Sequence, residues 1–67
     1  MTTQTFTVTG MTCGHCVASV TEEVSEIPGV RNVDVTLETG QVTVTSAEPL
    51  DSASVRAAVE EAGYQLA

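Results

Sequence analysis

Lysine is absent from this chain of 67 residues, and arginine occurs only at positions 31 and 56. Nine acidic residues against these two bases give a formal net charge of −7 and a pI near 4.1. Proteins that bind nucleic acids or anionic membrane surfaces contact phosphates through clustered lysine and arginine side chains. The sequence therefore excludes both as partners. Its acidity keeps a small protein soluble and favours a partner with a basic contact face.

Aromatic residues are almost as scarce, because tryptophan is missing and only Phe6 and Tyr64 remain. A core must therefore be built from valine, isoleucine, leucine, methionine and alanine, and 42% of the residues are hydrophobic. A chain of this length buries only about 60% of the surface that its unfolded form exposes. Residues 1–67 are thus expected to form a single small domain, too small for a deep substrate cleft.

The sequence also lacks a basic, apolar N-terminal segment and any run of the ~20 apolar residues that a membrane span requires. We therefore expect neither a secretory signal nor direct membrane insertion, and we expect a cytoplasmic protein. Thiols stay reduced in that compartment. The two cysteines, Cys13 and Cys16, then favour metal binding or catalysis over a structural disulfide.

Alternation of apolar and polar residues predicts strands over 5–9, 30–37 and 41–45. In the second strand, three residues are expected to point inward: Val33, Val35 and Leu37. Glu38-Thr39-Gly40 forms a short turn that makes a hairpin of the second and third strands. Residues 64–67 are enough for a short edge strand.

Two other segments carry apolar residues at helical spacing. The first runs from Val17 to Ile27 and is stopped by Pro28-Gly29. The second is capped by Asp51 or Ser52, and its apolar positions are Val55, Ala58, Val59 and Ala62. Gly63 is placed to end this helix in a left-handed conformation.

The resulting order is strand, helix, strand, strand, helix, strand. Each helix has a single apolar stripe, so both helices must cover one face of the sheet. We therefore predict an α+β, ferredoxin-like βαββαβ sandwich, in which two helices cover one face of a four-stranded antiparallel sheet.

The only chemical constellation in the chain is Met11-Thr12-Cys13-Gly14-His15-Cys16. If Cys13 lies on the loop and Cys16 in the first helical turn, both sulfurs can face one point. The free N–H groups and the dipole at a helix N-terminus favour negative charge there, and the thiolate is the form that binds metal. No Ser/His/Asp triad, carboxylate pair or phosphate loop is present, so we do not expect an enzyme.

Ligand number bears on which metal this site would take. Zn(II) prefers four ligands, whereas the chain supplies two thiolates, with His15 as a possible third donor. Cu(I) is selected by soft thiolates and accepts two of them. The ligand set thus favours Cu(I) over Zn(II). His15 itself is expected to face solvent, and its alternative role is to tune the thiolates.

At these residues a resemblance becomes specific. Gly10-Met11-Thr12-Cys13-Gly14-His15-Cys16 resembles the GMTCxxC signature of the heavy-metal-associated domain family, and the predicted order of elements covers essentially the whole chain. Within this family the chain is similar to the small bacterial copper chaperones. The resemblance implies that Cys13 and Cys16 bind Cu(I), and that the ion passes by thiolate exchange to the metal-binding domain of a copper-transporting P-type ATPase.

The resemblance also implies roles for three neighbouring residues. Met11 would pack beneath the metal loop as a core residue and not as a ligand. Thr12 fits the copper branch of the family, and Tyr64 matches a position near the metal where bacterial chaperones often have tyrosine. We expect a monomer without metal, and a bound ion could bridge two copies into a dimer.

Other functions stay open on the sequence. Cys-Gly-His-Cys also occurs in protein disulfide isomerases, so a dithiol oxidoreductase is one alternative. Against it stand Thr12 in place of the usual tryptophan, the short chain and the order of elements. The remaining alternatives are a metal-binding domain of a longer heavy-metal transporter and a mercury carrier.

Overall fold

The computed structural model describes residues 1–12 and 14–67. Its elements, in chain order, are strand β1 (Thr2–Thr9), helix α1 (Gly14–Ser25), strands β2 (Val30–Thr36) and β3 (Gln41–Ser46), helix α2 (Ser52–Glu61) and strand β4 (Gln65–Leu66). This is the predicted βαββαβ order. No helix within the described ranges has the length and apolar character needed to cross a membrane.

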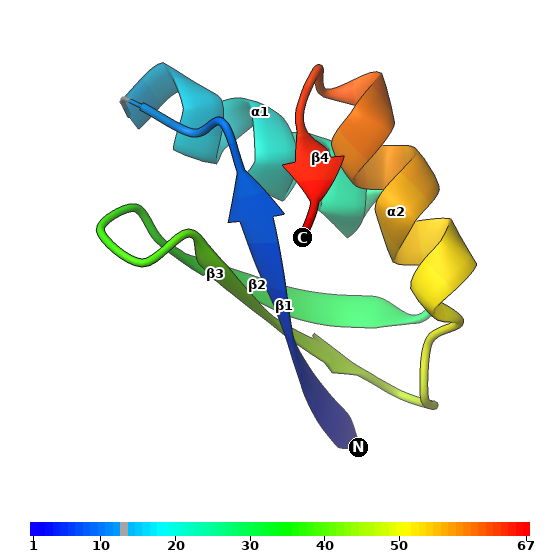
Figure 1. Ribbon diagram of the computed structural model, residues 1–67. Helices are drawn as coiled ribbons and strands as arrows, with labels where there is room; N and C mark the ends of the chain where they lie inside the picture. Colours follow the sequence, from blue (N-terminus) through cyan, green and yellow to red (C-terminus); the bar gives the residue numbers. More distant parts are fainter. Residues whose placement is uncertain (13) are drawn as a thin grey trace.

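The strands form one sheet in the order β2-β3-β1-β4, and each neighbouring pair is antiparallel. Both helices lie on the same side of this sheet (Figure 1). Strand β1 is central: it pairs with β3 from Thr2 to Thr7 and with β4 at Val8 and Thr9. The prediction of a ferredoxin-like sheet with two helices on one face is confirmed.

The core between the sheet and the helices consists of valines. Seven of them, from strands β1 and β3 and from both helices, are no more than 3% exposed: Val8, Val20, Val24, Val42, Val44, Val55 and Val59. Full burial of one such side chain contributes on the order of 1.5 kcal/mol. The helical and alternating spacings in the sequence therefore mark the residues that hold the two layers together.

The turn between β2 and β3 is pressed against β1 at Gly40. Its carbonyl accepts a hydrogen bond from the Val8 N–H at 2.7 Å, and its φ is +72°. A Cβ added at Gly40 would lie 2.5 Å from the Val8 carbonyl oxygen, closer than real contacts allow. Only glycine fits here, and the contact fixes the turn beside the last residues of β1.

Helix α2 is closed at both ends. The Asp51 side chain accepts a hydrogen bond from the Ala53 N–H at 3.0 Å, as the predicted N-cap does. At the other end Gly63 has a φ of +97°, and the N–H groups of Gly63 and Tyr64 donate to the carbonyls of Glu60 and Val59. This Schellman motif reverses the chain and directs it back along β1 as β4.

The main differences from the sequence predictions concern β1, α1 and β2. Strand β1 begins at Thr2 and not at residue 5, because its polar first residues pair with the end of β3. Helix α1 spans Gly14–Ser25 and not 17–27, so it begins within the Cys-Gly-His-Cys segment. The prediction that Leu37 points inward was wrong: β2 ends at Thr36, and Leu37 lies in the turn and is 37% exposed.

Candidate metal centre

The loop from β1 to α1 carries the predicted site. The chain leaves β1 at Gly10, whose φ of +92° turns it away from the sheet, and it enters α1 at Gly14. Cys13, the first predicted ligand, lies outside the described residues. This loop and the loop that precedes β4 lie at the same end of the sheet (Figure 1). The candidate site therefore lies at one end of the molecule, next to the C-terminal end of β1.

Cys16, the second predicted ligand, lies in the first turn of α1, as the sequence indicated. Its side chain is only 7% exposed. Thr12 lies against it: the Thr12 backbone N–H donates to the Cys16 sulfur across 3.5 Å, and the Thr12 hydroxyl oxygen is 3.9 Å from the same sulfur. The sulfur is thus held on the loop side of the helix and is mostly shielded from water.

The electrostatic surroundings of this sulfur suit a negative charge. Helix α1 has no acidic residue in its first turn, and residues 1–21 contain no aspartate, glutamate, lysine or arginine. The positive end of the helix dipole is therefore not offset by acidic side chains. The acids of α1 begin at Glu22, further along the helix.

The acidic half of α1 faces the end of α2. Partial burial, together with the nearby carboxylates of Glu26, Glu61 and Glu22, raises the pKa of Glu23. Glu22 and Glu26 are exposed on this helix, whereas Glu23 is half-buried. Negative charge is concentrated here and not at the start of the helix.

The three neighbouring residues singled out from the sequence have distinct positions. Met11 is half-buried and packs against the valine core. His15 is exposed on the first turn of α1. Tyr64 is half-buried, packs against the same core and contacts the loop, because a Cβ added at Gly10 would meet its Cδ1 atom at 3.4 Å.

Thr12 is the residue whose part in the site the sequence reasoning missed. The sequence offered one signal: a threonine four residues before a cysteine at the start of a helix, where backbone and side-chain donors gather. Sequence reasoning used Thr12 only as a mark of resemblance, since nothing in the spacing indicates that both of its donors reach the Cys16 sulfur.

Within residues 1–12 and 14–67, no three histidine, cysteine, aspartate or glutamate side chains come close enough to hold a metal ion together. These residues alone therefore build no closed site of the kind that structural zinc requires. The two-thiolate site predicted from the sequence needs only Cys16 and Cys13.

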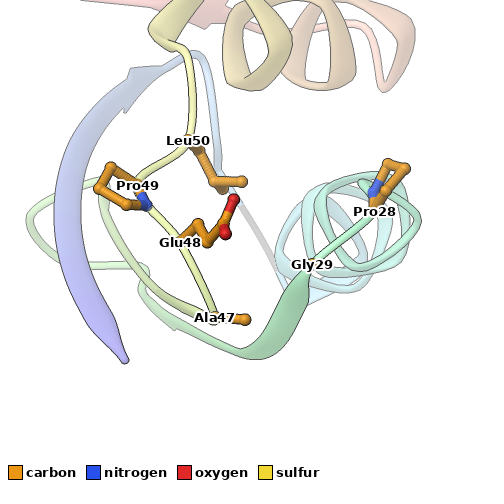
Figure 2. Close-up of a pocket in the computed structure, with 6 residues that line it drawn as sticks. All are labelled: Pro28, Gly29, Ala47, Glu48, Pro49 and Leu50. Atoms are coloured by element: carbon orange, nitrogen blue, oxygen red, sulfur yellow. The ribbon is translucent and has the colours of Figure 1, made fainter.

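A surface hollow of about 370 Å³ lies away from this loop, between the turn that follows α1 and the connector from β3 to α2 (Figure 2). It is lined by Pro28, Gly29, Ala47, Glu48, Pro49 and Leu50. None of these residues belongs to the predicted site, and Glu48 supplies the single ionisable side chain. The hollow therefore offers no metal-binding chemistry to compete with the Cys16 loop.

Comparison with known proteins agrees with this geometry. The model of the heavy-metal-associated domain matches residues 5–65. The chain belongs to the heavy-metal-associated domain family. The resemblance inferred from the GMTCxxC segment is thereby confirmed at the level of the family.

Relatives within this family include a copper chaperone and a copper-transporting ATPase. The chain is 40% identical to the "Copper chaperone CopZ" of Bacillus subtilis (strain 168), over 100% of this chain and 99% of that protein. It is also 40% identical over 63 residues to "Copper-transporting ATPase 1" of Rhizobium meliloti (strain 1021), but it spans only 8% of that protein's length. Among solved structures, "CopZ metallochaperone" matches with a TM-score of 0.91 and 34% identity, over 98% of this chain and 100% of that chain.

Proposed function

We propose that this chain is a copper-binding carrier of the heavy-metal-associated family, with residues 1–67 as one domain. It binds Cu(I) through the thiolates of Cys13 and Cys16. The observation that carries the proposal is the similarity to a copper chaperone over the full length of both chains. The position of Cys16 at the charge-free start of α1 supports it, because a thiolate is stabilised there.

Transfer would proceed by ligand exchange. A thiolate of a partner domain attacks the bound ion, a three-coordinate intermediate forms, and one thiolate of this chain leaves. Copper stays Cu(I) throughout, so no oxidant or reductant is needed. Copper-transporting ATPases with a related domain supply a suitable partner, as the Rhizobium relative indicates. The carrier is a cytoplasmic monomer without metal, and it exchanges copper without catalysing a reaction.

Anaerobic titration with Cu(I) against a chromogenic Cu(I) chelator tests the proposal. The wild-type chain should bind one ion tightly. Cys13→Ser and Cys16→Ser should each abolish tight binding, since a two-coordinate site needs both sulfurs, and each variant should keep the metal-free fold by circular dichroism. His15→Ala is the control for a side chain at the same loop, and it should keep one tight Cu(I) site.

Affinity in the same titration should fall steeply as the pH falls from 8 to 5.5, because protons compete with the metal for thiolates. Tight binding retained in either cysteine variant, or a flat pH profile, would refute the assignment. A Zn(II) titration in parallel separates the metals: a thiolate pair should release Zn(II) to a chelator far more readily than Cu(I).

The second candidate is a metal-binding domain of a longer transporter, and the 40% identity to the Rhizobium ATPase favours it. Both candidates bind Cu(I) at the same loop, so the titration does not distinguish them. The size of the native protein does. An immunoblot of cells that produce it should show a species near 6.9 kDa if the carrier is free-standing, and a far larger one if it is a transporter domain.

A further inference from the structure

We propose that the surface hollow between the turn after α1 and the connector from β3 to α2 is a docking site for an arginine side chain of a partner protein. Its lining residues are Pro28, Gly29, Ala47, Glu48, Pro49 and Leu50. The hollow is separate from the Cys16 loop, and its occupation requires no metal.

Hydrogen bonds hold the walls of the hollow in place. The Ala47 N–H donates to the Gly29 carbonyl at 2.9 Å, which joins the connector to the turn after α1. The side-chain amide of Gln4 forms two hydrogen bonds with Leu50. Its oxygen accepts from the Leu50 N–H at 2.8 Å, and its nitrogen donates to the Leu50 carbonyl at 3.3 Å. The hollow is therefore formed before a ligand arrives, which lowers the entropic cost of binding.

The lining of the hollow combines one charge with apolar surface. Among the described residues that line it, Glu48 has the only charged side chain. The buried Ser46 hydroxyl donates to the Glu48 carbonyl at 2.6 Å and fixes the backbone from which this side chain projects. Figure 2 shows the side chains of Glu48 and Leu50 on the side of the connector that faces Pro28. A ligand here meets a carboxylate next to apolar walls, and no lining residue supplies a basic group to neutralise it.

An arginine side chain matches this combination. Its three methylene groups can lie along the apolar walls, while the planar guanidinium donates to both oxygens of the Glu48 carboxylate. A volume of about 370 Å³ is near the lower end of the roughly 300–1,000 Å³ found for ligand pockets, so the hollow suits a single side chain. The net charge of −7 also attracts a basic partner and increases the rate of encounter.

The shape of the hollow favours a protein over a free guanidinium compound. Ala47, Glu48 and Pro49 are exposed, so the hollow is open to solvent. A pocket for a small molecule buries roughly 70–90% of the ligand's surface, which an open hollow does not achieve. An arginine that projects from a protein surface avoids this difficulty, because its neighbours cover the rim and exclude water.

The hollow lies at the opposite end of β1 from the metal loop. The connector follows Ser46, which pairs with Thr2 at the start of β1, whereas the loop to α1 leaves the other end of this strand. Figure 1 shows the two regions at opposite ends of the molecule. A partner held at the hollow therefore leaves the Cys16 loop accessible.

An NMR titration of the metal-free, reduced protein with the peptide acetyl-Leu-Arg-Leu-amide tests the docking site. At about 0.15 M NaCl, long-range attraction between exposed charges is largely screened. The backbone N–H signals of Gly29, Ala47 and Leu50 should shift and saturate, with a Kd on the order of 1 mM. Signals of the acidic half of α1 should stay unchanged, because this segment does not line the hollow.

Two changes remove the charge contact, one on each side. The peptide with citrulline in place of arginine keeps the shape and loses the positive charge, and Glu48→Gln does the same for the carboxylate. Each should weaken binding by about five-fold. Glu38→Gln removes one negative charge from the exposed turn between β2 and β3, and it should bind the arginine peptide as wild type does. The citrulline peptide needs no variant, so the test stands even if Glu48→Gln does not fold.

Equal affinity of the arginine and citrulline peptides would overturn the docking site. An equal loss in Glu38→Gln and Glu48→Gln would also overturn it, since the peptide would then respond to net charge alone. N-Butylguanidinium tests the source of the arginine: it should bind at least about three-fold more weakly than the peptide, because it cannot cover the rim. Equal binding of the two would overturn the assignment to a protein partner.

Discussion

Tyr64 connects two parts of the chain that are far apart in sequence. Its ring packs on the valine core and lies against Gly10, where the loop toward Cys13 begins. Gly10 has no side chain to push the ring away, and Gly63 gives the turn that points Tyr64 toward this loop. An aromatic ring with a polar end suits such a place, at the edge of the core and beside the loop that we propose binds an ion.

We expect Tyr64→Ala to release bound copper to a chelator faster than wild type does. Loss of the ring removes a cover that excludes water and slows attack by outside ligands, while loss of the hydroxyl removes about 1 kcal/mol of hydrogen bonding at most. Tyr64→Phe keeps the cover and should fold as wild type does. Stopped-flow absorbance with a chromogenic Cu(I) chelator measures the rates. If Tyr64→Ala exchanges copper at the wild-type rate, Tyr64 is a residue of the core edge only.

The sequence predicted the position of Cys16 better than the contacts that support it. The spacing of Cys13 and Cys16 indicates a pair of soft ligands at a helix start, and Cys16 lies there. The contact between Thr12 and Cys16 depends on how tightly the loop turns after Gly10, which no periodicity encodes. Residue types thus suggest candidate ligands, whereas the hydrogen-bond donors around them depend on the three-dimensional path of the loop.

The side chain of Asp51 caps the N-terminus of helix α2. The Asp51 carboxylate accepts from the Ala53 N–H, which would otherwise have no partner within the helix. We expect Asp51→Ala to lower the free energy of unfolding by about 1 kcal/mol, and Asp51→Asn to lower it only slightly, because asparagine caps equally well. Urea unfolding followed by circular dichroism measures both. Equal losses in the two variants would mean that the charge, and not the cap, is responsible.

The acidic side chains of helices α1 and α2 repel one another where the two helices meet. The pKa of Glu23 is raised in the folded protein, so its stabilising contribution is present at acid pH and is lost as the pH rises through that folded pKa. At neutral pH the ionised Glu23 carboxylate lowers the stability of the folded protein. We therefore expect Glu23→Gln to raise the melting temperature at pH 7, and this gain to shrink as the pH falls toward 4.

The control for this effect is Glu38→Gln in the exposed turn between β2 and β3. It removes one negative charge from the turn between β2 and β3, which is not where the acids of α1 and α2 meet. A gain for Glu38→Gln as large as that for Glu23→Gln would show that net charge matters and that the local repulsion does not. Melting curves of both variants at pH 4 and pH 7 give the comparison.

Element type followed from the sequence wherever burial has a period. The valine stripes of α1 and α2 and the alternation of β3 predicted these elements. A helix on a core buries every third or fourth residue, whereas a strand buries every second one. The first residues of β1 do not alternate with apolar residues in the sequence. Their pairing with β3 makes them part of the strand. Leu37 was placed inward because it continues the alternation, yet the hairpin pairing stops one residue earlier.

At the scale of the whole molecule, charge is unevenly spread. All nine acids lie after residue 21, and only two arginines offset them. Self-repulsion on this scale destabilises the compact state. Raising NaCl from about 0.01 M to about 0.15 M shortens the Debye length from about 30 Å to about 8 Å. We expect the melting temperature of the metal-free protein to rise by on the order of a few degrees.

Calorimetric scans at the two salt concentrations measure this shift. Potassium chloride at equal ionic strength is the control for a specific effect of sodium, and it should give the same rise. A melting temperature that stays constant or falls would show that the carboxylates are too far apart, or too well hydrated, to oppose folding.

The path of β1 also determines how the domain can be attached to something else. Strand β1 has eight residues, so its N-terminal end lies roughly 25 Å from the loop at its other end. Figure 1 shows the N-terminus projecting away from that loop. A tether at this point would leave the loop free to turn toward another molecule, with a reach determined by the length of the linker. The same fold can thus act as a diffusing protein or as one domain of a longer chain. The loop at the end of β1 is equally accessible in both.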